Sequence, residues 1–227
     1  GAYSPTIASN RINFSLGLMG PSFTIDLEGA ASLAAVAQGC HDLLPSADFR
    51  KQEIVAALAG GVTMLMSPYW WPVHGQYMNP VGRCFPFDEK AAGYIKGEGS
   101  SLFVLKRHAE KVEGELVVED GAQNLATLPG WAIANSGRTA SLTAPCGPAV
   151  QKVVADAVRT SSISPLDVDA IECDGKGHFL HDAVEVRSVL KHLRDLPGGD
   201  EEPLALCSSK SKIGYCQESA GVASLIG

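Results

Sequence analysis

The fold class expected for this chain rests on one stretch of sequence, Gly20-Pro21-Ser22-Phe23-Thr24-Ile25-Asp26-Leu27-Glu28-Gly29-Ala30-Ala31-Ser32-Leu33. Residues 22–26 predict a short buried strand, and residues 30–44, rich in Ala and Leu, predict a helix that ends before Pro45. A strand that turns sharply into a helix is typical of proteins in which helices cover a sheet of buried strands.

The same alternation of strand and helix continues on both sides of this stretch. Further strands are predicted at residues 54–61, 100–106, 116–119, 168–174 and 204–208. Further helices are predicted at residues 5–16, which Gly17 closes, at 148–160, at 181–193 and from 216 onward. A loop rich in Pro and aromatic residues is predicted from 67 to 88. The pattern indicates an α/β architecture with mainly buried strands.

Composition limits the size and the partners of the domain. The chain has 227 residues, of which 45% are hydrophobic and 19% charged, with a formal net charge of -7. Gly, Pro and Ser accumulate between residues 120 and 147, so we divide one compact domain into halves at residues 1–120 and 121–227. An acidic chain of low charge argues against a nucleic-acid partner, because phosphate binding needs a basic face.

No apolar run reaches the roughly 18–20 residues that span a bilayer, so we expect no transmembrane segment. The chain does not begin with Met, and we expect it to be part of a longer polypeptide. Its six cysteines have no CxxC or other metal-ligand spacing. They predict free thiols in a reducing intracellular compartment, the cytoplasm or the interior of an organelle, with no metal and no cofactor.

Short motifs along nearly the whole chain resemble those of one family, in the order in which that family carries them. They are Ser9-Asn10-Arg11-Ile12, Gly20 to Asp26, Gly60-Gly61-Val62 with Ser67-Pro68, Gly82-Arg83-Cys84 with Phe87-Asp88, Gly93 to Gly99, Leu142-Thr143-Ala144-Pro145, and Ser209-Lys210 with Ile213-Gly214. Together they resemble the β-ketoacyl synthases (ketosynthases) of polyketide and fatty acid synthesis. The resemblance implies a dimeric protein with the thiolase-like layered αβαβα fold. This chain would hold a part of it, without the first segment of the N-terminal half and the last segment of the C-terminal half.

The resemblance also assigns the catalytic positions. In the family a cysteine at the bend after the strand holds the acyl chain as a thioester, and two histidines stabilise the enolate oxygen and the departing carboxylate. The matching runs here are Asp26-Leu27-Glu28-Gly29, Glu172-Cys173-Asp174-Gly175-Lys176-Gly177-His178 and Lys210-Ser211-Lys212-Ile213-Gly214-Tyr215. The cysteine position is therefore Gly29, and the histidine positions are Asp174 and Tyr215. The supporting lysine is retained as Lys210.

These replacements predict a site that cannot condense acyl chains. Gly29 has no side chain and forms no acyl-enzyme, and a carboxylate at Asp174 would repel both the malonyl carboxylate and the enolate. Tyr215 can donate a hydrogen bond but is a poor proton mediator near neutral pH. Because losing one member of a cooperating catalytic unit costs on the order of 10⁴-fold, we expect no residual condensation. The chain is predicted to be a degenerate, non-catalytic ketosynthase homologue.

Other residues near these positions are alternatives for a nucleophile. Glu28 precedes Gly29, but its position on the bend normally points elsewhere. Cys173 adjoins Asp174 and Cys216 adjoins Tyr215. Neighbouring side chains of a strand face opposite ways, so we expect Cys173 to point away from the old cleft. We therefore disfavour a relocated nucleophile.

Three further groups of residues are candidates for binding. Lys176, Lys210 and Lys212, with Glu28 and Asp174, would form either a pocket for an anionic ligand such as the phosphate of a phosphopantetheine arm, or ion pairs that fill an abandoned cleft; we favour the ion pairs. His178 and His181 favour surface or packing roles over a metal site. Tyr69, Trp70 and Trp71 would form a contact patch, close the acyl channel, or pack in the core.

These features leave open alternatives for function. We favour a structural or assembly subunit that pairs with a protein partner, as a homodimer, as a heterodimer with an active ketosynthase, or in a larger assembly. The second is a module that binds an acyl chain or an acyl carrier protein without a covalent bond. The third is an enzyme with altered thioester chemistry.

Overall fold

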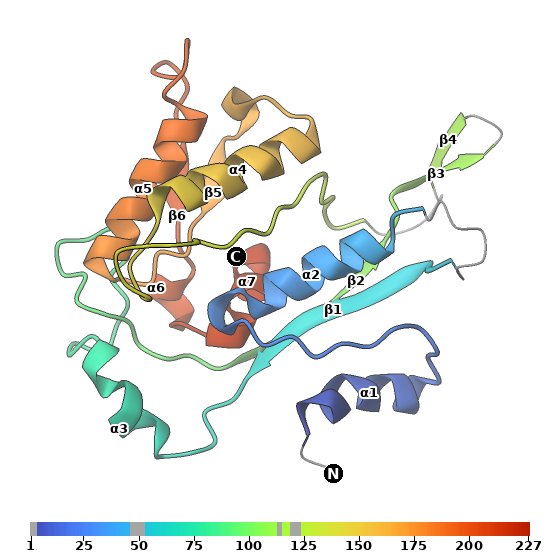
Figure 1. Ribbon diagram of the computed structural model, residues 1–227, viewed down its shortest axis with the longest axis horizontal. Helices are drawn as coiled ribbons and strands as arrows, with labels where there is room; N and C mark the ends of the chain where they lie inside the picture. Colours follow the sequence, from blue (N-terminus) through green and yellow to red (C-terminus); the bar gives the residue numbers. More distant parts are fainter. Residues whose placement is uncertain (1–3, 46–52, 113–114, 119–123) are drawn as a thin grey trace.

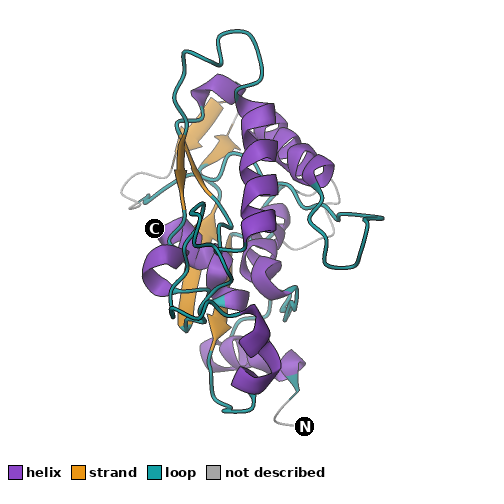
Figure 2. Cartoon of the chain, turned by 90° about the vertical axis from the view of Figure 1, so that its left-hand side faces the viewer, coloured by secondary structure: helices purple, strands orange, loops and turns teal. Residues whose placement is uncertain are grey.

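The computed structural model describes residues 4–45, 53–112, 115–118 and 124–227. Within these residues the strands form two-stranded sheets, paired as β1-β2, β3-β4 and β5-β6. Figure 1 shows α2 lying along the β1-β2 pair, and α4 and α5 beside β5 and β6. Seen from the side, the strands follow the length of the molecule with the long helices next to them (Figure 2).

The first sheet joins β1 (Ala56–Thr63) to β2 (Gly99–Lys106) in antiparallel register, from Ala56 opposite Lys106 to Thr63 opposite Gly99. The helix α2 (Ala31–Asp42) covers one face, and the short helix α7 (Ala220–Ile226) meets it there. Val36, Ala59 and Val222 form the buried core between these elements, with exposed fractions of 5% or less. This packing fixes the start of α2, where the first candidate site residue lies.

The second half is built on β5 (Ala170–Glu172), which runs parallel to β6 (Ala205–Cys207). The helices α4 (Gly147–Ser161) and α5 (Phe179–Leu193) pack against each other beside this pair. The short helix α6 (Lys210–Ile213) follows β6. Because β5 and β6 are parallel, the loops after both strands lie at the same edge. The second candidate, Asp174, follows β5 directly, and the third, Tyr215, follows β6 by way of α6.

The guanidinium of Arg194, at the end of α5, connects the loops of the second half by hydrogen bonds. It donates hydrogen bonds to the carbonyl oxygens of Glu202, Pro165, Leu193, Val168 and Pro203, at 2.6–3.0 Å. Arg194 is 9% exposed, and an arginine buried this deeply is stable only with its donors satisfied.

Most predicted elements are present, with ends displaced by one or two residues, except that the helix predicted from 216 onward begins as α7 at Ala220, after a 3-10 turn at Gln217–Ser219. The helix α1 (Pro5–Leu16) has the predicted bounds, and Gly17 closes it in the left-handed conformation with φ 67°. The predicted strand at 54–61 is β1, two residues later along the chain, and 100–106 is β2. The later strands are shorter than predicted, since β5 and β6 have three residues each.

Other predictions about the strands are wrong. Residues 22–26 pair with no strand among the described residues, and the ring of Phe23 is 59% exposed. A strand needs a neighbour to satisfy its backbone groups, and none lies beside this segment in the described part of the chain. The strands of the first sheet are also less buried than predicted: β2 alternates between half-buried and exposed residues, with Leu102 55% and Val104 66% exposed.

The segment from 67 to 88 contains a helix where only a loop was predicted. It is α3 (Trp70–His74), followed by a 3-10 turn at Gly75–Tyr77. Pro72 lies in the first turn of α3, where a missing backbone N–H costs little. The strand β3 (Ala109–Val112) was not predicted. It pairs with β4 (Glu115–Val118), which is the strand predicted at 116–119. The proposed boundary at residues 120 and 121 lies outside the described residues.

Candidate functional site

The bend before α2 holds the first candidate position, Gly29. It belongs to a 3-10 turn at Glu28–Ala30 that leads directly into α2. Glu28 has φ 47°, a left-handed conformation that non-glycine residues seldom adopt. This conformation turns the chain sharply from the extended segment into the helix.

Tyr215 fills the space beside Gly29. Its side chain is 7% exposed, and its ring meets the ring of Tyr94 edge-on at a centroid distance of 5.0 Å. Its backbone N–H donates to the carbonyl oxygen of Ile95 at 2.7 Å, which ties it to the segment that carries Tyr94. A β-carbon placed on Gly29 would lie 2.5 Å from the Tyr215 hydroxyl oxygen. In this arrangement only glycine fits at position 29.

Lys96 lies among aromatic rings, one of which belongs to Tyr215. No sequence motif predicted this cluster. Lys96 is 8% exposed, and its Nζ lies 4.2 Å from the ring centroid of Trp70, 5.1 Å from that of Tyr215 and 5.8 Å from that of Tyr94. Burial lowers the pKa of Lys96 to about 8. The rings offer cation–π attraction in place of the lost water. The only signals were one lysine in the 93–99 motif and one Trp in the aromatic segment.

Asp174 lies on the loop after β5, whose backbone is held by carboxylates from α5. Glu185 accepts hydrogen bonds from the N–H groups of Asp174 at 2.6 Å and Gly175 at 3.0 Å. Asp182, which is 4% exposed, accepts from the N–H groups of Gly177 at 3.1 Å and His178 at 3.2 Å. Burial is the largest cause that raises the pKa of Glu185. These contacts to α5 fix the backbone of the loop.

Of the ion pairs expected among these residues, the described part of the chain shows two, both to Asp174, and none of Glu28 or Lys212. The Nζ of Lys210 lies 3.3 Å from one carboxylate oxygen, and the Nζ of Lys176 lies 3.9 Å from the other. Lys210 is almost fully buried, with 4% of its side chain exposed, whereas Asp174 is 52% exposed. Lys176 also approaches the Tyr215 ring, at 5.4 Å from its centroid. Asp174, Lys210, Lys176 and Tyr215 thus form one cluster.

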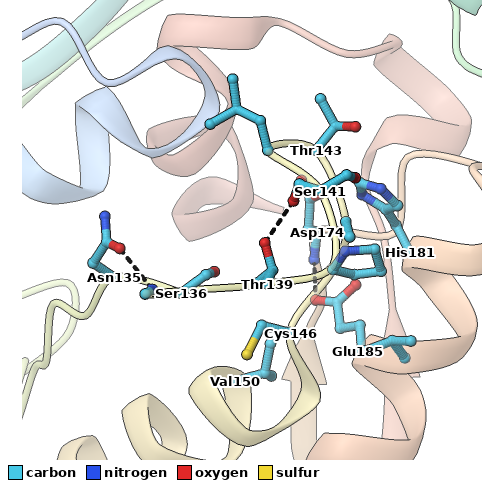
Figure 3. A pocket seen from close by; sticks show the side chains of 15 residues that line it. Asn135, Ser136, Thr139, Ser141, Thr143, Cys146, Val150, Asp174, His181 and Glu185 are labelled. Carbon is cyan, nitrogen blue, oxygen red and sulfur yellow. Dashed lines mark hydrogen bonds between the residues drawn. The ribbon is translucent and has the colours of Figure 1, made fainter.

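A cavity of about 720 Å³ opens beside Asp174. Figure 3 shows it between the loop of residues 135–146 and the side chains of His181 and Glu185 on α5. The loop is shaped by its own hydrogen bonds, such as that from the Thr139 hydroxyl to the Ser141 carbonyl at 2.5 Å. Burial lowers the pKa of His181, which favours a neutral imidazole there. In the sequence, Leu142 and Thr143 stood out only as part of a family motif.

The cysteines beside the candidate positions are poor nucleophiles. Cys173 is 2% exposed, and burial raises the pKa of its thiol to about 12. Cys216 is also 2% exposed, and burial raises the pKa of its thiol. Because the thiolate is the reactive form, both thiols are inert near neutral pH. Cys173 lies in the interior, consistent with a side chain that faces away from the cleft.

The remaining candidates lie apart from this cluster. Lys212 is exposed on α6. The rings of His178 and His181 lie 4.5 Å apart, and no group of three potential metal ligands occurs among the described residues. Tyr69 is 80% and Trp71 42% exposed, whereas Trp70 turns inward to Lys96. None of the described helices combines the length and apolarity that a membrane span requires.

Comparisons with known proteins agree with this architecture. The family model of the β-ketoacyl synthase N-terminal domain matches residues 1–111, and that of the β-ketoacyl synthase C-terminal domain matches residues 125–227. A phenolphthiocerol/phthiocerol polyketide synthase of Mycobacterium tuberculosis is 35% identical over 99% of this chain, which covers 10% of that protein. The PKS-NRPS hybrid synthetase ATPKS of Aspergillus niger is 37% identical over 98% of this chain and 12% of its own length.

Solved structures give the same answer. The ketosynthase from module 6 of the bacillaene synthase of Bacillus subtilis superposes with a TM-score of 0.81 at 26% identity, over 99% of this chain and 38% of its own. The oxazolomycin ketosynthase domain of Streptomyces albus gives 0.83 at 27%, over 98% and 36%. The chain therefore spans little more than a third of these domains. It carries part of the thiolase-like layered αβαβα fold and belongs to the β-ketoacyl synthase family.

Proposed function

We propose that this chain is a catalytically inactive ketosynthase homologue, retained as a structural or assembly subunit or as a dimer partner. One observation carries the proposal: the hydroxyl of Tyr215 lies 2.5 Å from the point where any side chain on Gly29 would begin. At the position that the family motif assigns to the acyl-carrying cysteine, this chain therefore has no side chain, and the Tyr215 hydroxyl lies close to where one would begin.

The charges nearby support the same conclusion. Decarboxylative condensation needs neutral hydrogen-bond donors where negative charge develops. Asp174 presents a carboxylate there instead, and its ion pair with Lys210 at 3.3 Å uses the one retained cation of the catalytic set. The buried thiols of Cys173 and Cys216 offer no substitute, since burial raises the pKa of both.

The test is acyl transfer, measured by intact-protein mass spectrometry with an acyl thioester, together with carbon dioxide release from a malonyl thioester. The natural chain should show neither. Gly29→Cys should also remain unacylated, because Tyr215 blocks the new side chain. In the double variant Gly29→Cys with Tyr215→His, the smaller ring at position 215 leaves room for the cysteine side chain. Acyl adduct formation or decarboxylation by the natural chain at rates above the thioester alone would overturn the proposal.

An assembly role is supported by large apolar side chains that face solvent. Phe14 is 90% exposed on α1, and Met19 and Phe23, in the segment that leads to Gly29, are 92% and 59% exposed. Large exposed apolar side chains close together in the sequence are consistent with a surface that another protein surface covers. Native mass spectrometry should therefore recover a dimer or a larger complex. Recovery as a monomer at micromolar concentration would contradict this role.

The cavity beside Asp174 favours a second candidate, non-covalent binding of an acyl chain or an acyl carrier protein. Its volume of about 720 Å³ lies within the range of ligand pockets, and the half-buried Val150 and Val184 supply apolar lining. Calorimetric titration with an acyl-pantetheine tests it, with Val150→Ser as the pocket variant. Absence of heat at millimolar ligand would exclude this function.

A further inference from the structure

A second cavity, of about 320 Å³, lies between α6 and the loop after α3. Its lining includes four cationic residues, Arg83, Lys96, Lys210 and Lys212, and no acidic one. The rest of the lining is Gly, Ser, Cys and Ile. This concentration of positive charge is unexpected in a chain with a formal net charge of -7. It marks the cavity as a place where an anion would be attracted.

The cations differ in how far their charge is already balanced. Lys210 is paired with Asp174 at 3.3 Å, so its charge is largely neutralised. Lys96 is held by aromatic rings, and its pKa of about 8 leaves it mainly charged at pH 7. Arg83 and Lys212 are exposed, and neither forms an ion pair with a described residue. Two exposed cations at one cavity therefore lack a counter-charge.

The architecture holds the two sides of the cavity together. A backbone bridge pairs Lys96 with Tyr215, and the Cys84 thiol accepts a hydrogen bond from the Ile95 N–H at 3.3 Å. These contacts fix the segment of Arg83 beside the segment of Lys212. Contacts within the chain therefore hold both sides of the cavity in place.

We propose that this cavity is a binding site for a phosphate monoester. An arginine fork and an ammonium group together match a dianion with several oxygen acceptors, which a carboxylate does not offer. The volume of about 320 Å³ is large enough to hold a small phosphate ester. The test does not depend on the proposed loss of condensation, because it removes Arg83 and Lys212, which are not among the assigned catalytic positions. Of the sequence candidates, Lys210 and Lys212 line it, and Lys176 does not.

The experiment is calorimetric titration of the whole chain with glycerol 1-phosphate, with inorganic phosphate and with acetate, at low salt and pH 7.5. Binding of both phosphates is expected, with heat absent for acetate. Arg83→Gln and Lys212→Gln should each weaken phosphate binding by about tenfold, the size of one lost charge-assisted contact. Lys191→Gln is the matched control, since Lys191 is an exposed cation of α5 outside this cavity.

Circular dichroism of each variant verifies that it is folded, and because Arg83 and Lys212 are exposed, both variants should fold. Phosphate binding that weakens as much in Lys191→Gln would show only general attraction and would overturn the site. Acetate binding as strong as phosphate binding would overturn the ligand class. No heat from the natural chain at about 10 mM phosphate would overturn the proposal altogether.

Discussion

The steric conflict between position 29 and Tyr215 predicts a specific dependence of stability on both residues. The perturbation is Gly29→Ala, made alone and together with Tyr215→Phe. The added β-carbon would lie 2.5 Å from the hydroxyl oxygen of Tyr215 but 3.4 Å from the ring carbon that bears it. Removing the hydroxyl therefore turns an overlap into an ordinary contact. The hydroxyl forms no hydrogen bond with a described residue, so Tyr215→Phe is a clean change.

Two opposing contributions set the expected change in the free energy of unfolding. Overpacking of this kind costs about 1–3 kcal/mol. Replacing glycine by alanine at an ordinary φ, which Gly29 has, returns about 0.4–1 kcal/mol through the unfolded chain. In the natural background Gly29→Ala should therefore lower the free energy of unfolding by about 1–2 kcal/mol. In the Tyr215→Phe background the same change should be neutral or slightly stabilising.

Urea denaturation of the four proteins of the cycle measures this coupling. The two residues are in direct contact, so an interaction energy of about 1–3 kcal/mol is expected. An equal effect of Gly29→Ala in both backgrounds, within about 0.5 kcal/mol, would refute the reasoning. It would mean that the Tyr215 ring moves aside freely and that position 29 is not blocked.

Three more predictions concern charges and thiols. Asp174→Asn should lower the free energy of unfolding by about 1–3 kcal/mol, because it leaves the buried Lys210 ammonium without its counter-charge; a urea titration that detects no change would contradict this. Lys96 has its pKa lowered from 10.5 to about 8, so the folded state binds fewer protons than the unfolded state between these values. Stability relative to Lys96→Met should therefore rise from pH 8 to pH 10.5, and a flat difference would exclude the shift. Alkylation at pH 8 followed by mass spectrometry should label the exposed Cys207 first and Cys173 only on unfolding; equal labelling rates in the folded chain would disprove the burial of Cys173.

The sequence predicted the order of elements well wherever local signals were sufficient. A Pro-led helix closed by Gly17 needed only local capping, and its bounds are correct. The strand at residues 22–26 failed because a strand depends on a hydrogen-bonding neighbour, which no local pattern shows. The candidate positions Gly29, Asp174 and Tyr215 came from motifs, and the ion pair of Asp174 with Lys210 followed from charge.

The contacts between motifs were not predictable in the same way. Lys96 meets Trp70, Tyr94 and Tyr215 from separate parts of the chain, so only the folded structure brings the cluster together. The same holds for the hydroxyl of Tyr215 and Gly29, which are distant in the sequence but in contact in space. A motif position can be predicted from the sequence one residue at a time. A steric conflict depends on two residues that only the fold brings together.

The steric conflict between positions 29 and 215 does not restrict both positions equally. Any side chain at position 29 conflicts with the Tyr215 hydroxyl, since even a β-carbon approaches to 2.5 Å, whereas glycine at position 29 is compatible with a smaller ring at position 215. The contacts with Tyr94 and Lys96 hold the Tyr215 ring beside position 29. A cysteine introduced at position 29 alone would therefore lack the room that its side chain needs, and a smaller ring at position 215 would be required with it.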